Sequence, residues 1–528
     1  MNRPRDIVLY DTTLRDGMQR EGLSVSVDEK IRIAQRLAAI GIHVVEGGFP
    51  GSNPKDAEFF SRMANVDLGG TRVSAFGMTR ARGVPAADDP VVRTLAESWA
   101  PISCVVGKTW ALHVEKVLKV DRDENLRMID ESIRFLRGEG KEVVYDAEHF
   151  FDAYAEHPDY ALECLRAAAD AGAGTVVMCD TNGATMPAVL GEVVDAVRSA
   201  LGDLVHLGIH THNDSACAVA NSLVAVEKGV THVQGTINGY GERCGNADLC
   251  AIIPSLKLKM GRDCITDENL AGLTDTAHFV AELCNVSPDP QQPYVGRNAF
   301  AHKGGLHVAG IRVDPRTFEH VSPAAVGNVP HILVSELSGK GTVRRRLEDL
   351  GVEVESGDEV VDRLLQRLKQ KEHDGYHYEA ADASFELLLL AELGQRIEFF
   401  RLESFRIIVE KRADGAVMTE ATIKVHVDGD RVIQTAEGNG PVNALDKALR
   451  LAIESKYPHL GEIHLVNFKV RILDENKGTG AVTRVLIDSS DGRDSWGSVG
   501  VSENLVEASW QALVDSLNYG LYRPRALD

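Results

Sequence analysis

Short hydrophobic runs alternate with longer amphipathic segments through the first half of the chain. Segments such as DEKIRIAQRLAAIG carry apolar residues three and four positions apart and end at a glycine, which is typical of helices. The runs between them are β-rich and lie at 7–11, 43–49, 72–78, 102–107, 142–148, 175–180, 206–210 and 232–237. Eight such strand–helix units predict an α/β fold, a TIM (β/α)8 barrel. A doubly wound open sheet is the alternative, but no GxGxxG motif follows the first run.

The pattern changes twice after the barrel. Residues 276–395 lose the β rhythm and begin with the Pro-rich stretch SPDPQQPYVG, so we expect a linker with small helical subdomains. Residues 396–528 alternate strands and helices, and ATIKVHVDGDRVIQTAEGNGPVNALDKALRLAI resembles TRVLIDSSDGRDSWGSVGVSENLVEASWQALVDSL. This duplicated ββα unit predicts an α+β domain whose exposed sheet faces form a dimer or bind a regulator. The expected domains are therefore 1–275, 276–395 and 396–528.

Composition narrows the classes of protein. A chain of 528 residues, 44% hydrophobic and 26% charged, is typical of a globular protein with two or three domains. The formal net charge of −21 disfavours nucleic acid and anionic membranes as partners. No long apolar run or signal-peptide pattern is present, so we expect a cytoplasmic protein. The eight cysteines form no CxxC pair, and we expect most of them to be buried thiols.

Unusual polar motifs follow five of the eight predicted strands. They are DTTLRDG after the first strand, DAEH after the fifth, DTNG after the sixth, HTHND after the seventh and NGYGERCGN after the eighth. The carboxyl ends of the strands form the catalytic face of a TIM barrel. The motifs therefore predict an active site at this end of the barrel.

His210 and His212 are two positions apart on the seventh predicted strand, so both side chains leave the same face. Two inward imidazoles form half of a divalent-metal site, and Asp16 on the first loop supplies an oxygen ligand. Asn246, after the eighth strand, adds a carbonyl oxygen. The alternative for the two histidines is a hydrogen-bonded pair inside the barrel.

Other residues at the same end have substrate-binding interpretations. Arg15 offers a fixed cation for a keto-acid carboxylate or an enolate oxygen, unless it only forms an ion pair with Glu148 or Glu242. Thr181 can hydrogen-bond a carboxylate, although the DT pair is also a common helix cap.

Glu148 and the HKGGLH segment are the candidates for acid–base chemistry. Glu148 ends the fifth strand in partly apolar surroundings, where burial would raise the pKa of a catalytic base, and the alternative is a carboxylate that supports the metal site. His302 and His307 surround paired glycines, which suits a cap over the site, and an exposed histidine pair is the alternative.

The order DTTLRDG, HTHND and GYGERCGNA resembles the metal-dependent acyltransferase family of isopropylmalate, homocitrate and citramalate synthases. The resemblance covers nearly the whole chain, because the segment from about residue 400 is similar to the regulatory dimer domain of these enzymes. YDAEHFFD and VGVSENLVEASWQALVDS are most similar to the citramalate synthase branch. The resemblance implies condensation of acetyl-CoA with a short 2-keto acid, expected to be pyruvate. It also implies a homodimer and feedback by an amino acid, expected to be isoleucine.

The resemblance also implies roles for individual residues. Asp16, His210 and His212 would bind Mn, Mg or Zn, with Asn246 as a weaker ligand. Arg15 would act as the electrostatic catalyst, Thr181 would bind the keto-acid carboxylate, and Glu148 and His307 would carry out the acid–base work. The family usually has a tyrosine in a TYEH segment, where this chain has TFEH with Phe318, so the role of that phenol is in doubt.

Three alternatives to this function remain. Isopropylmalate synthase differs only in the pocket for the keto-acid side chain, which we expect Phe76, Met78 and Tyr145 to line. An acyl-CoA lyase would not be expected to carry the long C-terminal domain. An inactive amino-acid sensor would have no need of an intact set of metal ligands.

Overall fold

The computed structural model describes residues 7–523 except 203, 303–306, 308–309, 312, 333–357, 379–380, 474–477, 479 and 493. The chain forms two compact units. The first comprises Met1–Phe300 and Glu319–His331, and the second comprises Ala301–Phe318 and Ile332–Asp528. None of the helices in the described ranges is long and apolar enough to cross a membrane.

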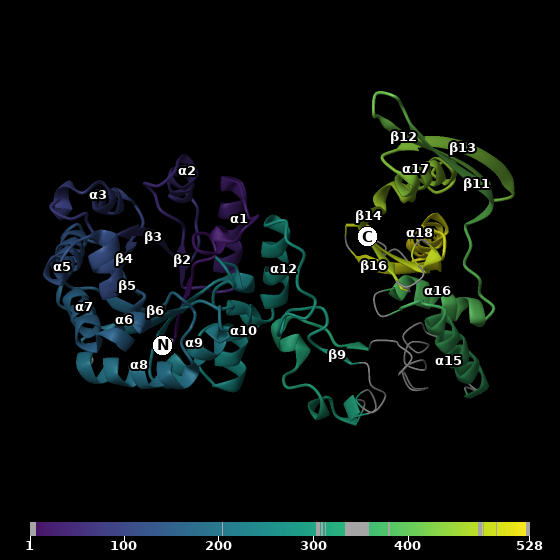
Figure 1. Cartoon of the computed structure of the whole chain (residues 1–528). Coiled ribbons are helices and arrows are strands. Elements are labelled where there is room, and N and C mark those ends of the chain that lie inside the picture. Colours follow the sequence, from purple (N-terminus) through teal and green to yellow (C-terminus); the bar gives the residue numbers. More distant parts are fainter. Residues whose placement is uncertain are drawn as a thin grey trace. The chain divides into compact units, whose positions relative to one another are not determined.

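The first unit contains a closed barrel of eight parallel strands (Figure 1). The strands are β1 (Val8–Asp11), β2 (Val44–Glu46), β3 (Arg72–Met78), β4 (Ile102–Lys108), β5 (Glu142–Glu148), β6 (Thr175–Asp180), β7 (His206–Thr211) and β8 (His232–Gly235). Because β1 pairs with both β2 and β8, the sheet has no free edge. The eight predicted strands are confirmed, and the open doubly wound sheet is excluded.

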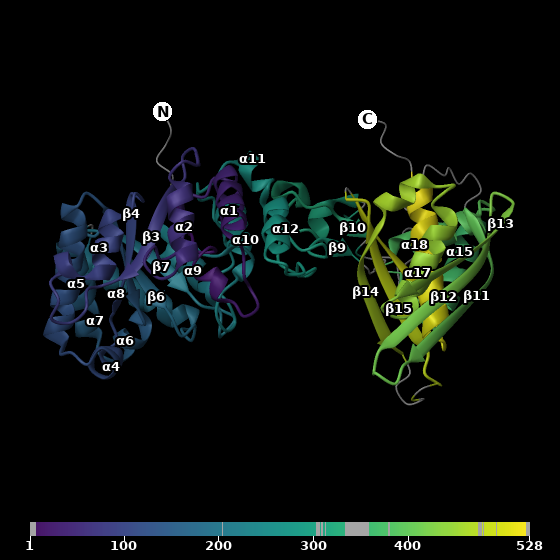
Figure 2. The same cartoon turned by 90° about the horizontal axis from the view of Figure 1, so that it is seen from above.

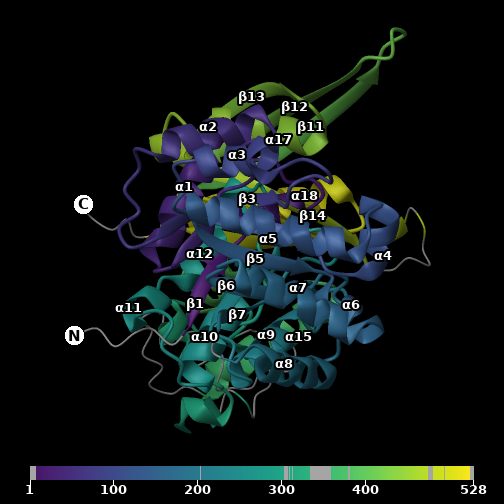
Figure 3. The same cartoon turned by 90° about the vertical axis from the view of Figure 1, so that its left-hand side faces the viewer.

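Helices surround the barrel, and α5, α7 and α8 follow one another along its outer face (Figure 3). The helices of this unit are α1 (Val27–Ala39), α2 (Pro54–Met63), α3 (Pro90–Glu97), α4 (Ala111–His113), α5 (Arg122–Gly138), α6 (Phe150–Glu156), α7 (Pro158–Asp170), α8 (Pro187–Leu201), α9 (Ala218–Glu227), α10 (Leu249–Pro254), α11 (Asp267–Leu270) and α12 (Leu273–Leu283). Many begin at a polar cap, and Ser26 forms a full capping box with Glu29 at the start of α1. The amphipathic pattern thus orients each helix toward the strands.

Strand alternation separates two layers of side chains. Outward residues such as Leu207 and Ile209 pack with the helices in the main core, as the sequence predicts. Inward residues fill the barrel with a smaller cluster made of Tyr10, Val44, Ile102, Cys104, Val144, Val177 and Cys179. Toward the carboxyl ends of the strands, the inward positions become polar, and this change creates the candidate site.

The second unit contains two similar layers of sheet and helix (Figure 2). Strands β11 (Phe400–Lys411), β12 (Val417–Val427) and β13 (Asp430–Gly438) are followed by α17 (Pro441–Ile453). Strands β14 (His464–Ile472), β15 (Thr483–Ser490) and β16 (Ser495–Ser502) are followed by α18 (Leu505–Tyr522). The predicted duplication is present, but each copy is a βββα unit and not a ββα unit. The additional strands β11 and β14 are largely exposed, so their burial pattern is weak.

Two further helices pack on this second unit, α15 (Asp358–His373) and α16 (Asp382–Glu392). Leu364, Leu368 and Phe385 share a hydrophobic cluster with Val499 and Val501 of β16. These two helices, which precede the C-terminal strands in the sequence, therefore pack against the C-terminal sheet. Two short strands, β9 (Ala301–His302) and β10 (His331–Ile332), pair with each other.

Candidate metal and substrate site

The loop after β1 is held in place by its own side chains. Thr13 donates from its backbone N–H and its hydroxyl to the two carboxylate oxygens of Asp11, at 2.8 Å each. The Thr13 hydroxyl also accepts from the backbone N–H of Ile237, which follows β8. The first loop is therefore fixed against the loop after β8, and Asp16 lies on it near the end of β7.

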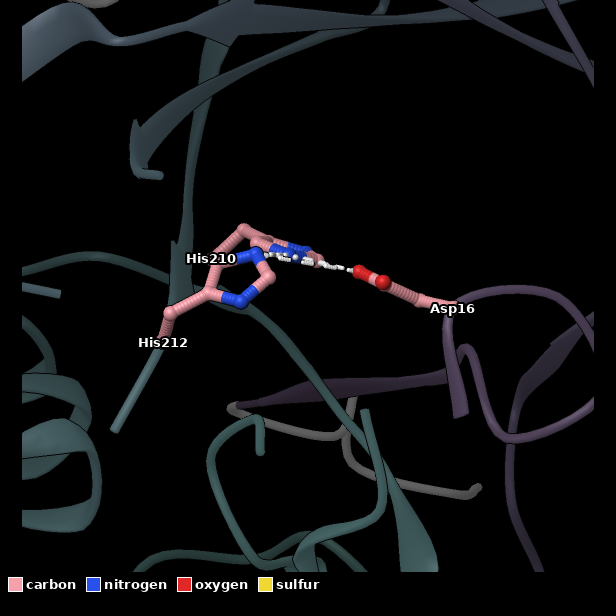
Figure 4. Close-up of side chains that lie close together, drawn as sticks. All are labelled: Asp16, His210 and His212. Carbon is pink, nitrogen blue, oxygen red and sulfur yellow. Dashed lines mark hydrogen bonds and ion pairs between the residues drawn. The ribbon is translucent and has the colours of Figure 1, made fainter. Parts of the chain in front are cut away.

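Asp16 from the loop after β1 converges with His210 of β7 and with His212, which follows β7 (Figure 4). Asp16 Oδ2 lies 3.1 Å from His210 Nε2 and 3.9 Å from His212 Nε2, and the two Nε2 atoms are 3.3 Å apart. All three residues are buried. One carboxylate oxygen and two imidazole nitrogens thus face a common point, which is the donor set of a divalent-metal site.

Electrostatics favours the ligating forms of Asp16 and His212 but the protonated form of His210. Burial opposes the charge of Asp16, but Arg15 and the two histidines hold the pKa of its carboxyl well below the usual range. Burial, together with His210, lowers the pKa of His212 to about 3, so its imidazole is neutral. Burial also opposes a charge on His210, but the hydrogen bond to Asp16 raises its pKa. A cation is therefore the species that this cluster of lone pairs attracts.

Asn246 completes the group. Its Nδ2 donates to Asp16 Oδ2 at 2.9 Å and lies 3.2 Å from His210 Nε2, whereas its Oδ1 is buried without a hydrogen-bond partner. Amide oxygen and nitrogen exchange places by a rotation of the side chain, which would turn the orphaned oxygen toward the cluster. The residues present therefore fit a divalent cation with mixed nitrogen and oxygen ligands.

Arg15 lies beside the triad of Asp16, His210 and His212, and other side chains contact its guanidinium on two sides. Its Nε donates to Glu46 Oε1 at 2.5 Å, and its guanidinium carbon lies 4.0 Å from the centre of the Phe76 ring. Burial opposes its charge, but Glu46 and Asp16 raise the pKa of Arg15 above its ordinary value. Arg15 does form an ion pair, but its main partner is Glu46 and not the expected Glu148 or Glu242.

Two cavities meet at Arg15. The larger, of about 730 Å³, contains the triad and is also lined by Phe76, Met78, Val106, Lys108, Asp146, Glu148 and Thr181. The second, of about 650 Å³, extends over the loop before α2 and is lined by Lys30 and Lys55 among others. Arg15, Gln19 and Phe76 line both cavities. The guanidinium of Arg15, which lies on the loop after β1, is therefore accessible from two cavities large enough for a substrate.

Thr181 and Glu148 both line the larger cavity, as predicted from their strand ends. The Thr181 hydroxyl accepts from the backbone N–H of His149 at 2.8 Å, and Arg243 donates to the Thr181 carbonyl at 2.7 Å. Glu148 is not buried as expected, since its side chain keeps 23% exposure and forms an ion pair with Lys108. The apolar burial invoked for this base is therefore absent, although its position at the cavity is retained.

Tyr145 is the site residue that the structure contradicts. It is fully buried in the core outside the barrel and does not line the larger cavity, whereas its neighbours Asp146 and Glu148 do. Successive residues of a strand face opposite sides, so Tyr145 points to the helices when Asp146 points inward. Phe76 and Met78, the other predicted pocket residues, are inward and line the cavity.

His302 and His307 belong to the second unit. His302 is half-buried in β9, and His307 is exposed with its ring stacked on Phe318 at a centroid distance of 4.2 Å. The larger cavity is lined by residues of the barrel unit, so neither histidine contributes to it. The function of these histidines as a cap stays a prediction. The glycines between them lie outside the described residues.

Two buried residues at the site were missed from the sequence. Glu46, which is fully buried at the end of β2, holds Arg15 and accepts a hydrogen bond of 2.6 Å from the hydroxyl of Tyr10. Gln234 in β8 contacts both His210 and Asp146. A signal for both existed, because each is a polar residue inside an otherwise apolar strand, where a buried polar group needs a partner.

Family models match three successive parts of the chain. Residues 6–280 match the HMGL-like model, residues 294–375 match the homocitrate synthase post-HMGL domain-like model, and residues 379–521 match the LeuA allosteric (dimerisation) domain. The first of these spans more than half of the chain and includes the whole candidate site.

Curated relatives align along nearly the full length. The (R)-citramalate synthase of Geobacter sulfurreducens is 50% identical, over 99% of both chains. That of Streptomyces coelicolor is 47% identical, over 98% of this chain and 96% of its own. The 2-isopropylmalate synthase of Pyrococcus furiosus is only 30% identical, over 97% of this chain and 99% of its own. Both of these (R)-citramalate synthases are thus more similar to this chain than the 2-isopropylmalate synthase is.

Proposed function

Because the chain belongs to the (R)-citramalate synthase branch of the HMGL-like family, we propose that it condenses acetyl-CoA with pyruvate and water to give (R)-citramalate and CoA. The observation that carries this proposal is the cluster of Asp16, His210 and His212 beside Arg15, at the junction of two cavities. A reaction that joins two anionic substrates needs both of them beside a common cation, which is Arg15 here. The site offers that arrangement.

Asp16, His210 and His212 would hold Mn, Mg or Zn, and Asn246 would add its amide oxygen after rotation of the side chain. When bound, the ion supplies Lewis acidity toward the keto carbonyl and a template for the keto acid. Thr181, across the same cavity, donates its hydroxyl proton to the carboxylate of pyruvate. The His149 N–H fixes the direction of that hydroxyl, because it occupies one of the oxygen's acceptor positions.

Arg15 stabilises the negative charge that develops on oxygen during carbon–carbon bond formation. Its guanidinium is held by Glu46 and Phe76 before substrate arrives, so little reorganisation is needed in the transition state. We assign acetyl-CoA to the second cavity, where Lys30 and Lys55 lie, and pyruvate to the cavity that contains the triad. The two substrates then meet at Arg15.

Glu148 is the proposed base that removes a methyl proton from acetyl-CoA. The enolate carbon bonds to the keto carbon of pyruvate, and the keto oxygen takes up a proton to become the tertiary hydroxyl. Water then adds to the thioester carbonyl, and the carbon–sulfur bond breaks to release CoA. We assign His307 to this hydrolytic step. Phe318, stacked on its ring, carries no hydroxyl with which to polarise water.

The C-terminal unit is the proposed regulatory part. Its match to the LeuA allosteric (dimerisation) domain supports a homodimer whose activity falls when an amino acid binds. The resemblance to the citramalate synthase branch favours isoleucine as that effector. Inhibition by isoleucine at saturating pyruvate, without loss of the dimer in light scattering, is the expected behaviour.

A thiol-release assay tests the proposed function. Purified protein with Mn²⁺ and acetyl-CoA is incubated with pyruvate, 2-ketoisovalerate, glyoxylate or 2-ketoglutarate, and the product is resolved by chiral chromatography. We expect release of CoA with pyruvate and formation of (R)-citramalate. Release with 2-ketoisovalerate and none with pyruvate would identify an isopropylmalate synthase and contradict the proposal.

A further inference from the structure

Gln234 is a buried polar residue that bridges the candidate metal site and the barrel interior. It lies on β8 directly opposite His210 of β7 and has no solvent exposure. Its Oε1 is 2.8 Å from His210 Nδ1, on the side of the ring away from Asp16. Its Nε2 donates to Asp146 Oδ1 at 3.0 Å and lies 3.4 Å from His232 Nε2.

Two acceptors determine which way the Gln234 amide faces. An ionised carboxylate such as Asp146 only accepts, so the group that approaches it must be the NH₂ group. Burial lowers the pKa of His232 to about 3, and its neutral ring with the proton on Nδ1 would offer Nε2 as a second acceptor on the same side. The amide oxygen must then face His210. A flipped amide would place oxygen against the carboxylate of Asp146.

The direction of this amide decides the tautomer of His210. An amide oxygen only accepts, so His210 must carry a proton on Nδ1 to complete the 2.8 Å hydrogen bond. With Nδ1 protonated, loss of the proton from Nε2, which lies 3.1 Å from the Asp16 carboxylate, leaves the lone pair there, and this is the form that binds a metal. We propose that Gln234 is a positioning residue that fixes the ligating tautomer of His210, with Asp146 and His232 holding its amide in place.

This inference rests on the proposed metal-binding function of His210 and concerns how the ligand is prepared. Hydrogen-bond partners of ligating histidines are typically worth about 10- to 100-fold in metal affinity. Gln234 is fully buried, so water does not replace its oxygen, and His210 has this one partner at Nδ1 among the described residues. We therefore expect metal affinity to fall by at least about tenfold when the acceptor is removed.

The test compares two substitutions of matched size in the full-length protein. Gln234→Met removes the acceptor, whereas Gln234→Glu keeps an oxygen that accepts from His210 Nδ1 and, when its other oxygen is protonated, a donor to Asp146. Ser103→Ala is the control, because the Ser103 hydroxyl is fully buried in the same barrel without a hydrogen-bond partner. Mn²⁺ affinity is measured by electron paramagnetic resonance of the free ion, and folding by circular dichroism. The Nδ1–H resonance of His210 is followed in ¹⁵N spectra of the Zn²⁺-loaded protein.

We expect Gln234→Met to bind Mn²⁺ at least about tenfold more weakly than wild type, and Gln234→Glu and Ser103→Ala to bind more tightly than Gln234→Met. The wild type should show a slowly exchanging Nδ1–H proton on His210, which needs no variant to observe. Equal Mn²⁺ affinity of wild type and folded Gln234→Met would overturn the inference, as would a wild-type His210 protonated at Nε2 in the Zn²⁺ form. A wild type that binds no Mn²⁺ or Zn²⁺ would instead overturn the proposed function.

Discussion

Substitution of Glu46 by glutamine tests the proposed active site through a residue that lines neither cavity. Glu46 is fully buried and accepts hydrogen bonds from Arg15 at 2.5 Å and from Tyr10 at 2.6 Å. Glutamine has nearly the same shape, but it has no charge, and its NH₂ group must face one of these two donors. Arg15 would then keep only Asp16, at 3.6 Å, as a charged partner.

The magnitude follows from burial and geometry. Removal of one partner of a buried ion pair costs about 3–5 kcal/mol, and we expect the lower end because Asp16 and one hydrogen bond remain. Displacement of a catalytic group by about 1 Å can cost about 100-fold in rate. We therefore expect Glu46→Gln to lower the free energy of unfolding by about 3 kcal/mol and kcat/KM by about 100-fold. Most of the loss should be in kcat, because Arg15 acts on charge that develops in the transition state.

The assay pairs urea denaturation with initial rates of CoA release. Ser74→Ala is the matched control, because the Ser74 hydroxyl contacts Tyr10 at 2.9 Å in the same buried cluster and carries no charge. This control should keep kcat/KM near the wild-type value. Glu46→Gln with reduced stability and unchanged kcat/KM would show that Glu46 supports the fold without orienting Arg15. Unchanged stability as well would refute the energetic reasoning.

Three further outcomes are expected. His212→Ala should lower metal affinity and turnover by more than about 100-fold, measured by metal titration and CoA release, and full turnover would contradict the metal mechanism. Thr181→Val should raise KM for pyruvate by about tenfold or more with a smaller change in kcat, since a hydrogen bond to a charged group is worth about 1.5–3 kcal/mol. Burial raises the pKa of Asp515, which accepts from Ser384, to about 6, so the folded state binds this proton more tightly than the unfolded state. The free energy of unfolding of the C-terminal unit should therefore fall as pH rises from about 4 to 6. Asp515→Asn lacks this titration, so its free energy of unfolding minus that of wild type should be about 2–3 kcal/mol higher at pH 8 than at pH 4, measured by urea denaturation. An equal effect at both pH values would contradict this sign.

The barrel and the convergence of Asp16, His210 and His212 could be predicted because their signals are local and periodic. Each strand is a short run with regular spacing, and barrel closure then places the first loop beside the last strands. This closure brings Asp16 to His210 and His212 across almost 200 positions of sequence. The HxH spacing sufficed to place both imidazoles on one face, because strand alternation leaves no other arrangement.

The wrong predictions arise where the local sequence pattern does not show which way a strand's side chains face. Tyr145 and Asp146 are adjacent in an apolar strand, and the choice of which one faces inward needs a reference residue. The first strand of each C-terminal repeat was missed because β11 and β14 are exposed along most of their length. The predicted carboxylate partners of Arg15 are wrong, because Glu46 ends a three-residue strand that is too short for alternation to show which way its side chain points.

The inward direction of these strand residues explains why the carboxyl end of the barrel favours a bound cation. Asp16, Glu46 and Asp146 bring three carboxyl groups into the buried upper part of the barrel, and Arg15 neutralises one charge. Burial, followed by the proximity of Glu46, raises the pKa of Asp146 to about 6, so at neutral pH it is still mostly ionised. Uncompensated buried charges are costly, and a divalent ion at His210 and His212 would supply the missing positive charge. The inward polar residues thus form one electrostatic unit in which a bound metal would stabilise the fold of the site as well as support its chemistry.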